Sequence, residues 1–147
     1  MLKNILNMLS KEIDDDNSNI QAVFAGLLVR AARIDNDYTK DEKVEIERII
    51  QDRFNITGQE AKKFRMLGED IEEKTIDTVQ ITREIKKEIP FESRKELVKN
   101  LWSIILTDKY RSDEENSFMR TCVKLIGVND VDSAKARNSI IAKNEKS

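Results

Sequence analysis

The 147-residue sequence contains no histidine, one cysteine, one proline and four glycines. Without histidine, the catalytic triads and dyads that need imidazole and the histidine motifs for metals are all excluded. A single cysteine excludes an intramolecular disulfide and a thiolate zinc cluster. Scarce proline and glycine leave too few turn residues for a sandwich or barrel of short strands. Together these absences predict an all-α fold.

Charge and hydropathy exclude further classes of protein. The chain has 26 basic and 28 acidic residues and a net charge of −2. It therefore lacks the positive field of a protein that binds phosphate backbones, and no nucleic-acid partner is expected. No run approaches the roughly 18–20 apolar residues of a transmembrane segment, and the start lacks the features of a signal peptide. The sequence predicts a cytoplasmic protein.

Helical periodicity divides the chain into three parts. Residues 1–16 carry apolar side chains at helical spacing and predict a short amphipathic helix that packs on the domain. Peripheral contact of this helix with a membrane surface is the alternative. Residues 17–142 predict a single-domain helical bundle, about seven or eight helices in all. The lysine-rich residues 143–147 are expected to fray.

Apolar stripes and capping signals place the helices of the bundle. Capping boxes begin at Thr39, Thr57, Ser93 and Ser112, and Gly127 is a natural C-cap. The predicted helices cover residues 17–34, 39–54, 57–71, 75–89, 93–105, 112–126 and 130–141.

One pattern occurs twice in the chain: a helix, an acidic turn, a capping box and a second helix. Asp35 aligns with Asp108, and Glu42 with Glu115, at a constant offset of 73 residues (108 minus 35, 115 minus 42). Flanking apolar positions align at the same offset: Leu28 with Leu101, Ala31 with Ile104, Ala32 with Ile105, Ile46 with Met119, and Ile49 with Cys122. We interpret the pattern as an internally duplicated helix-turn-helix unit.

The two turns concentrate carboxylates. Asp35 and Asp108 lie at or just past a helix C-terminus, where the helix dipole makes a carboxylate unfavourable by about 0.3–1 kcal/mol. A hard divalent cation, Ca²⁺ or Mg²⁺, would compensate, because it binds carboxylate oxygens and the free carbonyls of a helix end. The predicted metal ligands are Asp35, Asp37, Asp41, Glu42, Asp108 and Glu115.

Capping without a metal is the alternative. Glu42 and Glu115 end the capping boxes, and acidic residues are favoured in the first turn of any helix. Neither turn is an EF-hand; counted from Asp35, the sixth position is Lys40 instead of glycine and the twelfth is Ile46 instead of glutamate. The repeated aspartate at the helix end, which capping does not need, favours the cation.

With these residues identified, the sequence resembles the TerB-like family of tellurite-resistance-associated helical domains, whose motifs read Ala-Asp-Gly-x-hydrophobic-x-x-x-Glu. The similarity lies in residues 27–35 and 101–108 and extends over about residues 20–137. It implies an all-α, non-catalytic bundle with a divalent-cation site at Asp35 with Glu42 and at Asp108 with Glu115.

The chain departs from the family pattern in both turns. Asn36 and Lys109 replace the usual glycine, and Arg111 follows Tyr110 in the second turn. Asparagine tolerates a left-handed conformation, so the first turn is little affected. Lys109 and Arg111 could neutralise the second turn internally. The first turn is therefore the better candidate.

These observations support three functional hypotheses. The first is a non-enzymatic TerB-like domain that binds a cation and docks a protein partner, in tellurite-type stress resistance or an envelope-associated complex. The second is a metal-independent protein interaction module. The third, ranked last, is a carboxylate-metal hydrolase, which needs an open coordination position in a concave pocket. The sequence is also compatible with a weak homodimer.

Overall fold

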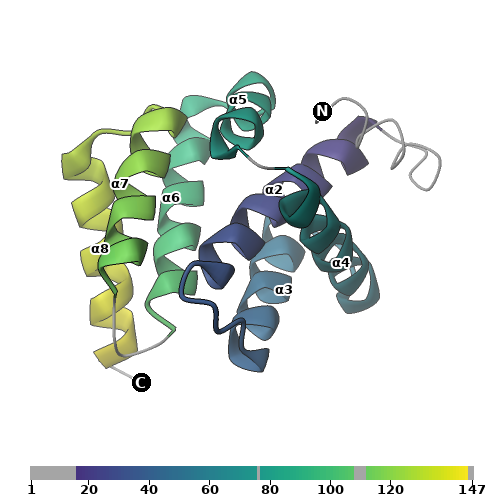
Figure 1. Ribbon diagram of the computed structural model, residues 1–147, viewed down its shortest axis with the longest axis horizontal. Helices are drawn as coiled ribbons and strands as arrows, with labels where there is room; N and C mark the ends of the chain where they lie inside the picture. The colour runs from purple at the N-terminus through teal and green to yellow at the C-terminus, as the bar shows by residue number, and fades with distance from the viewer. Residues whose placement is uncertain (1–15, 76, 108–111, 146–147) are drawn as a thin grey trace.

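The computed structural model describes residues 16–75, 77–107 and 112–145, which form seven α-helices and no strand (Figure 1). The predicted all-α class is confirmed. The predicted N-terminal helix lies outside the described residues, apart from Asp16, which begins the first described helix. The helices are α2 (Asp16–Arg33), α3 (Lys40–Phe54), α4 (Gly58–Lys74), α5 (Thr78–Glu88), α6 (Phe91–Ile105), α7 (Asp113–Ile126) and α8 (Asp130–Glu145).

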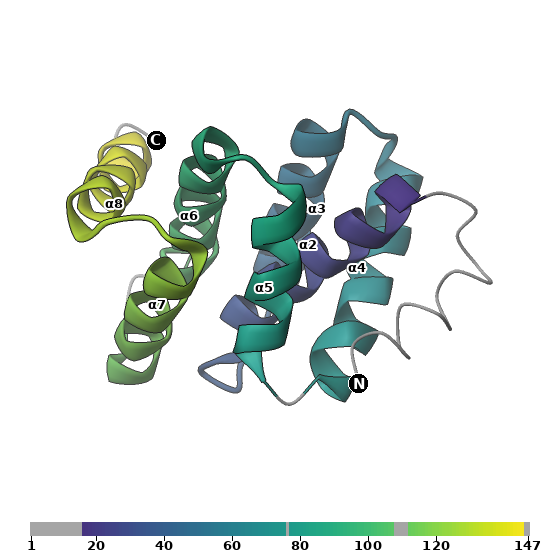
Figure 2. The same ribbon diagram turned by 90° about the horizontal axis from the view of Figure 1, so that it is seen from above.

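Helix α2 is the centre of the bundle. It packs on α3, α4, α5 and α6, and its apolar side chains from Ala22 to Ala32 are 1% exposed or less. Helices α6, α7 and α8 form the other side of the molecule, where α6 contacts α2 directly, and α5 lies over α2 when the bundle is seen from above (Figure 2). None of the described helices is long and apolar enough to cross a membrane.

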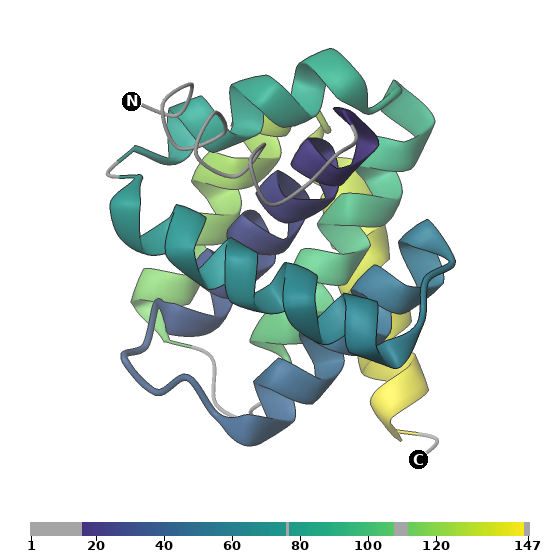
Figure 3. The same ribbon diagram turned by 90° about the vertical axis from the view of Figure 1, so that its right-hand side faces the viewer.

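Helices α2 and α4 cross, as Figure 3 shows, and their backbones approach closely at the crossing. A Cβ atom added at Gly68 of α4 would lie 2.7 Å from the Ala25 carbonyl carbon and 2.8 Å from the Gly26 nitrogen. One added at Gly26 would lie 3.0 Å from a methyl carbon of Ile71. Two glycines therefore let the two backbones touch, because no side chain separates them.

Three of the four predicted capping boxes are confirmed. The hydroxyls of Thr39, Thr57 and Ser112 each accept the backbone N–H of the glutamate three residues on, at 3.1, 3.2 and 3.1 Å. In return, each of these glutamates accepts the backbone N–H of the capping residue. Gly127 ends α7 with φ 85° and Asn36 adopts φ 62°, both as predicted from their tolerance of the left-handed region.

The predicted box at Ser93 is wrong, because α6 begins two residues earlier at Phe91. Pro90 ends the preceding segment at φ −61°, and its carbonyl already accepts the Arg94 N–H at 3.0 Å. The first turn of α6 is thus formed before Ser93 is reached, since the proline ring sets a φ suited to a helix start.

Three other helix boundaries differ from prediction by three residues or more. Helix α4, predicted to end at residue 71, continues to Lys74. Helix α5 begins at Thr78, because Asp77 caps it by accepting the Val79 N–H at 2.9 Å. Helix α8 continues to Glu145, so residues 143–145, expected to fray, are helical.

The duplication is visible in the core. All five aligned apolar pairs are buried, with no member more than 2% exposed. The helix pair α2 and α3, here called the first unit, therefore buries the same positions as the pair α6 and α7, the second unit.

Candidate functional site in the acidic turns

The first acidic turn joins α2 to α3 through residues 34–39. The Asn36 N–H donates to the Arg33 carbonyl at 3.1 Å and ends the helix. Oδ1 of Asp35 accepts the Asp37 N–H at 3.0 Å, which makes a local Asx turn. Asp35 is half-buried, whereas Asp37 and Asp41 are exposed. Asp35 therefore shapes the turn, and the other two aspartates face water.

Two of the predicted ligands, Glu42 and Glu115, are buried carboxylates. Each is only 3% exposed. Oε1 of Glu42 accepts from the Thr39 N–H at 2.9 Å, and Oε1 of Glu115 accepts from the Ser112 N–H at 3.0 Å. A third capping-box glutamate, Glu60, makes the same kind of bond to the Thr57 N–H at 3.1 Å and is exposed. Capping alone therefore does not require the burial of Glu42 and Glu115.

The second acidic turn is described only in part. Asp108, Lys109, Tyr110 and Arg111 lie outside the described residues, so the predicted pairing of Asp108 with Glu115 stays a prediction.

The predicted carboxylates do not converge into a cluster. Within residues 16–75, 77–107 and 112–145, no three Asp, Glu or Cys side chains lie close enough together to hold a metal ion. Asp35 and Glu42 instead accept hydrogen bonds from N–H groups of their own turn. Because Ca²⁺ takes six to eight oxygens, carbonyls and water would supply most of its ligands here.

A hydrogen-bonded network that sequence reasoning missed joins the first turn to α4. The Tyr38 hydroxyl donates to Oε2 of Glu69 at 2.7 Å, and Arg65 forms ion pairs with Glu69 and, at 2.7 Å, with Glu47. Burial, and then the hydrogen bond to Glu69, raise the pKa of Tyr38, so its hydroxyl remains a donor. The sequence signal for this network is the spacing of Arg65 and Glu69, because residues four apart on a helix lie close together.

Arginines at the end of α2 add to the same anchor. Arg33 pairs with Glu72 at 2.8 Å, and its guanidinium lies 5.0 Å from the centroid of the Tyr38 ring. Arg30 donates to the Glu72 carbonyl at 3.0 Å and to the Thr78 hydroxyl at 3.1 Å. Both arginines are thus committed to α4 and its connection to α5.

The comparison with protein families decides the fold family. The sequence model described as "Tellurite resistance protein TerB" matches residues 21–138, which include both acidic turns. The chain belongs to the TerB family. The expected resemblance is thereby confirmed over most of the sequence. Comparison with curated proteins and with solved structures found no match.

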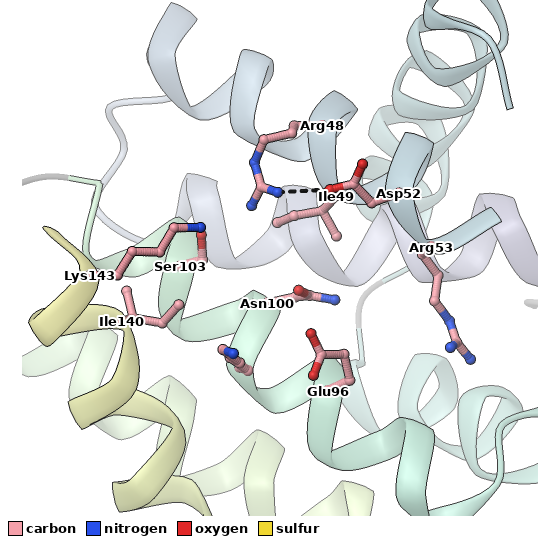
Figure 4. A pocket seen from close by; sticks show the side chains of 10 residues that line it. Arg48, Ile49, Asp52, Arg53, Glu96, Asn100, Ser103, Ile140 and Lys143 are labelled. Atoms are coloured by element: carbon pink, nitrogen blue, oxygen red, sulfur yellow. Dashed lines mark hydrogen bonds and ion pairs between the residues drawn. The ribbon is translucent and has the colours of Figure 1, made fainter. Parts of the chain in front are cut away.

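A cleft in this TerB domain lies between α3, α6 and α8, with a volume of about 310 Å³ (Figure 4). Arg48 lies at its edge and pairs along α3 with Asp52 at 3.0 Å and with Glu45 at 2.5 Å. The Ser103 hydroxyl donates to the same Glu45 carboxylate. None of the described predicted metal ligands lines the cleft. The cleft and the acidic turns are therefore separate places on the TerB domain.

Proposed function

We propose that this TerB domain is a non-enzymatic module that binds a divalent cation, Ca²⁺ or Mg²⁺, at its acidic turns and thereby presents a docking surface to a protein partner. The supporting observation is the contrast among three capping-box glutamates. Glu42 and Glu115 are 3% exposed, whereas Glu60 in the same motif is exposed. The two that are buried are the two that have an aspartate seven residues before them in the sequence, Asp35 and Asp108.

The physical argument concerns the cost of burial. A carboxylate that leaves water loses hydration energy, and this loss has to be offset by hydrogen bonds or by positive charge. A bound cation is often the largest local charge in such a site and would favour the ionised form of Glu42. The first turn is the better candidate, because Tyr38 fixes it to α4 and because its sequence lacks the Lys109 and Arg111 of the second turn.

The biological setting is proposed from the family. The description of the matching family refers to tellurite resistance. We place this domain, on that basis, in tellurite-type stress resistance or in an envelope-associated complex, with a cytoplasmic location.

Thermal unfolding with added cation tests the proposal. Chelator-stripped wild type and the variants Glu42→Gln, Glu115→Gln, Asp35→Asn and Asp108→Asn are titrated with Ca²⁺, Mg²⁺ and Mn²⁺ at fixed ionic strength. Glutamine keeps the capping acceptor and removes only the charge. A cation that binds the folded state alone stabilises it by RT ln(1 + [L]/Kd), about 2.7 kcal/mol at one hundred times Kd.

The matched control is Glu60→Gln, which changes the same motif at an exposed position. We expect wild type and Glu60→Gln to gain stability equally, and Glu42→Gln and Asp35→Asn to lose the gain. An identical response of all the proteins would mean that the ions only screen surface charge, and cation binding at the turns would be abandoned.

A metal-independent interaction module is the second candidate. It is favoured by one observation: no three carboxylates of the described residues converge. On this alternative the turns are capped and anchored without an ion, and no variant changes a cation response. The hydrolase hypothesis ranks third, since the cleft of Figure 4 holds none of the described predicted ligands.

A further inference from the structure

A second cavity, of about 270 Å³, lies between α6, α7 and α8. Its walls combine an apolar part with a charged part. Trp102, Met119 and Val123 supply the apolar surface. Arg120, Arg137 and Asp130 supply two positive charges and one negative charge. The cavity therefore offers apolar contact, cationic donors and an anionic acceptor within the space of one or two side chains.

Four arginines of the described residues form ion pairs, whereas Arg53, Arg83, Arg94 and the two arginines of this cavity form none. The four that pair are Arg30, Arg33, Arg48 and Arg65. Within the part of the chain that the structure describes, Arg120 and Arg137 form none. Guanidinium groups bind carboxylates through two parallel hydrogen bonds, so uncommitted arginines at a cavity favour a carboxylate ligand.

The apolar wall is rigid. Trp102 is 6% exposed, and its indole N–H donates to the Ser133 hydroxyl at 3.0 Å. The guanidinium of Arg137 lies 5.8 Å from the centroid of the indole ring. Trp102 therefore serves the core and also presents a fixed surface to the cavity, with one of the two arginines held above its ring.

We infer that this cavity binds the C-terminal residue of a partner polypeptide. The terminal carboxylate pairs with Arg120 and Arg137, the apolar side chain packs on Trp102 and Met119, and the peptide N–H donates to Asp130. The volume lies just below the roughly 300–1,000 Å³ of common small-molecule sites, which suits a single residue.

The acidic group distinguishes this ligand from a phosphate. Asp130 repels a phosphate dianion more strongly than a singly charged carboxylate, and a phosphate monoester dianion offers Asp130 no hydrogen-bond donor. A peptide supplies an N–H beside its carboxylate. The inference does not depend on a bound cation, because none of the cavity residues named here belongs to the proposed cation site.

Peptide titration tests the inference directly. Three fluorescein-labelled hexapeptides that end in Leu, Val or Phe are made with a free C-terminal carboxylate and as C-terminal amides. Binding to the full chain is followed by fluorescence polarisation in the presence of chelator. With unlabelled peptides, the fluorescence of Trp102 gives a second readout, because it is the single tryptophan of the chain.

We expect at least one acid peptide to bind, and its amide to bind about tenfold or more weakly, since a charge-assisted pair is lost. Arg120→Gln and Arg137→Gln should weaken the acid peptide by a similar factor. Arg83→Gln is the matched control, an exposed arginine of α5 without an ion pair among the described residues. It should bind as wild type does.

Three results would overturn the inference. Equal binding of acid and amide would remove the role of the carboxylate. Absence of binding by all three acid peptides up to about 1 mM, where the binding free energy is only about −4 kcal/mol, would remove the site. Equal affinity for N-acetyl-leucine and for the Leu peptide would assign the cavity to a small carboxylate and not to a polypeptide.

Discussion

The two units differ most clearly at Gly26 of the first and Lys99 of the second, which align at the offset of 73 residues. Gly26 faces Gly68 and Ile71 of α4 at contact distance. Lys99 is half-buried and lines the cleft of Figure 4. At this position the same helix of the repeat is thus in close contact with α4 in one copy and lines a cleft in the other.

The charges follow the same division. In the first unit, Arg30 and Arg33 are tied to Glu72 of α4. In the second, Arg120 has no ion pair among the described residues, and α6 contributes Trp102 to the cavity beside it. The two units thus differ in these arginines: those at the end of α2 pair with α4, whereas Arg120 of α7 is exposed and forms no ion pair among the described residues.

Disruption of the close contact between α2 and α4 should have the largest effect on stability. Gly68→Ala places a methyl group 2.7 Å from Ala25 and should lower the free energy of unfolding by about 2–3 kcal/mol. Urea unfolding followed by circular dichroism measures it. Gly58→Ala, in the same helix with no atom within 4 Å of the added carbon, should be neutral or stabilising by up to about 1 kcal/mol. An equal loss of unfolding free energy in Gly68→Ala and Gly58→Ala would show that the α2–α4 contact is not tight.

Truncation of the buried capping glutamates should have the second-largest effect on stability. Glu42→Ala and Glu115→Ala leave a sheltered backbone N–H without its acceptor, which costs about 1–3 kcal/mol. Glu60→Ala exposes the corresponding N–H to water and should cost about 0.5–1 kcal/mol. The denaturant midpoints of the three variants measure these losses and show whether Glu42 of the first unit and Glu115 of the second contribute more than the exposed Glu60. A loss for Glu60→Ala as large as the other two would remove the distinction.

A smaller, pH-dependent effect is expected at Glu45, where α3 of the first unit meets Ser103 of the second. Burial alone would raise the pKa of Glu45, but hydrogen bonds from Arg48 and Ser103 outweigh it and lower the pKa. A lowered folded-state pKa gives stability that is present above the unfolded value of about 4.3 and is lost as the pH falls through the folded value.

Glu45→Gln should therefore be less stable than wild type at pH 7, by below about 1 kcal/mol for a partly exposed pair. The difference should shrink below about pH 4.3. Thermal unfolding from pH 7 to pH 2.5 measures it. A difference that stays constant over this range would show that the charge of Glu45 contributes nothing.

The smallest expected effect concerns the thiol reactivity of Cys122. This residue occupies the position in the second unit that Ile49 occupies in the first. Both are buried, at 0% and 2% exposure, and burial raises the pKa of the Cys122 thiol to about 12. Native protein should not react with a disulfide reagent at pH 8, whereas unfolded protein should react fully. Fast labelling of the native state would mean that the second unit opens locally.

Helix positions were largely predictable from local signals, and the exceptions have local causes. The capping boxes at Thr39 and Ser112 were found because both partners lie within four residues. The box at Ser93 failed because Pro90 starts the helix earlier, a competing signal of the same short range.

The site was less predictable, because its contacts are distant in sequence. Tyr38 meets Glu69 across 31 residues, and Arg30 meets Thr78 across 48. Nothing in the composition of the first turn indicates that α4 will anchor it. The burial of Glu42 and the exposure of Glu60 likewise depend on which helix covers each N-terminus, which the shared motif does not encode.

The burial of α2 has a consequence for how the chain is made. This helix comes early in the sequence, yet part of its cover is supplied by α5 and α6, more than forty residues later. A nascent chain that ends before Phe91 would leave apolar side chains of α2 in water. The duplicated units are therefore copies in sequence but not independent folding units, and a ribosome has to release most of the protein before either can be completed.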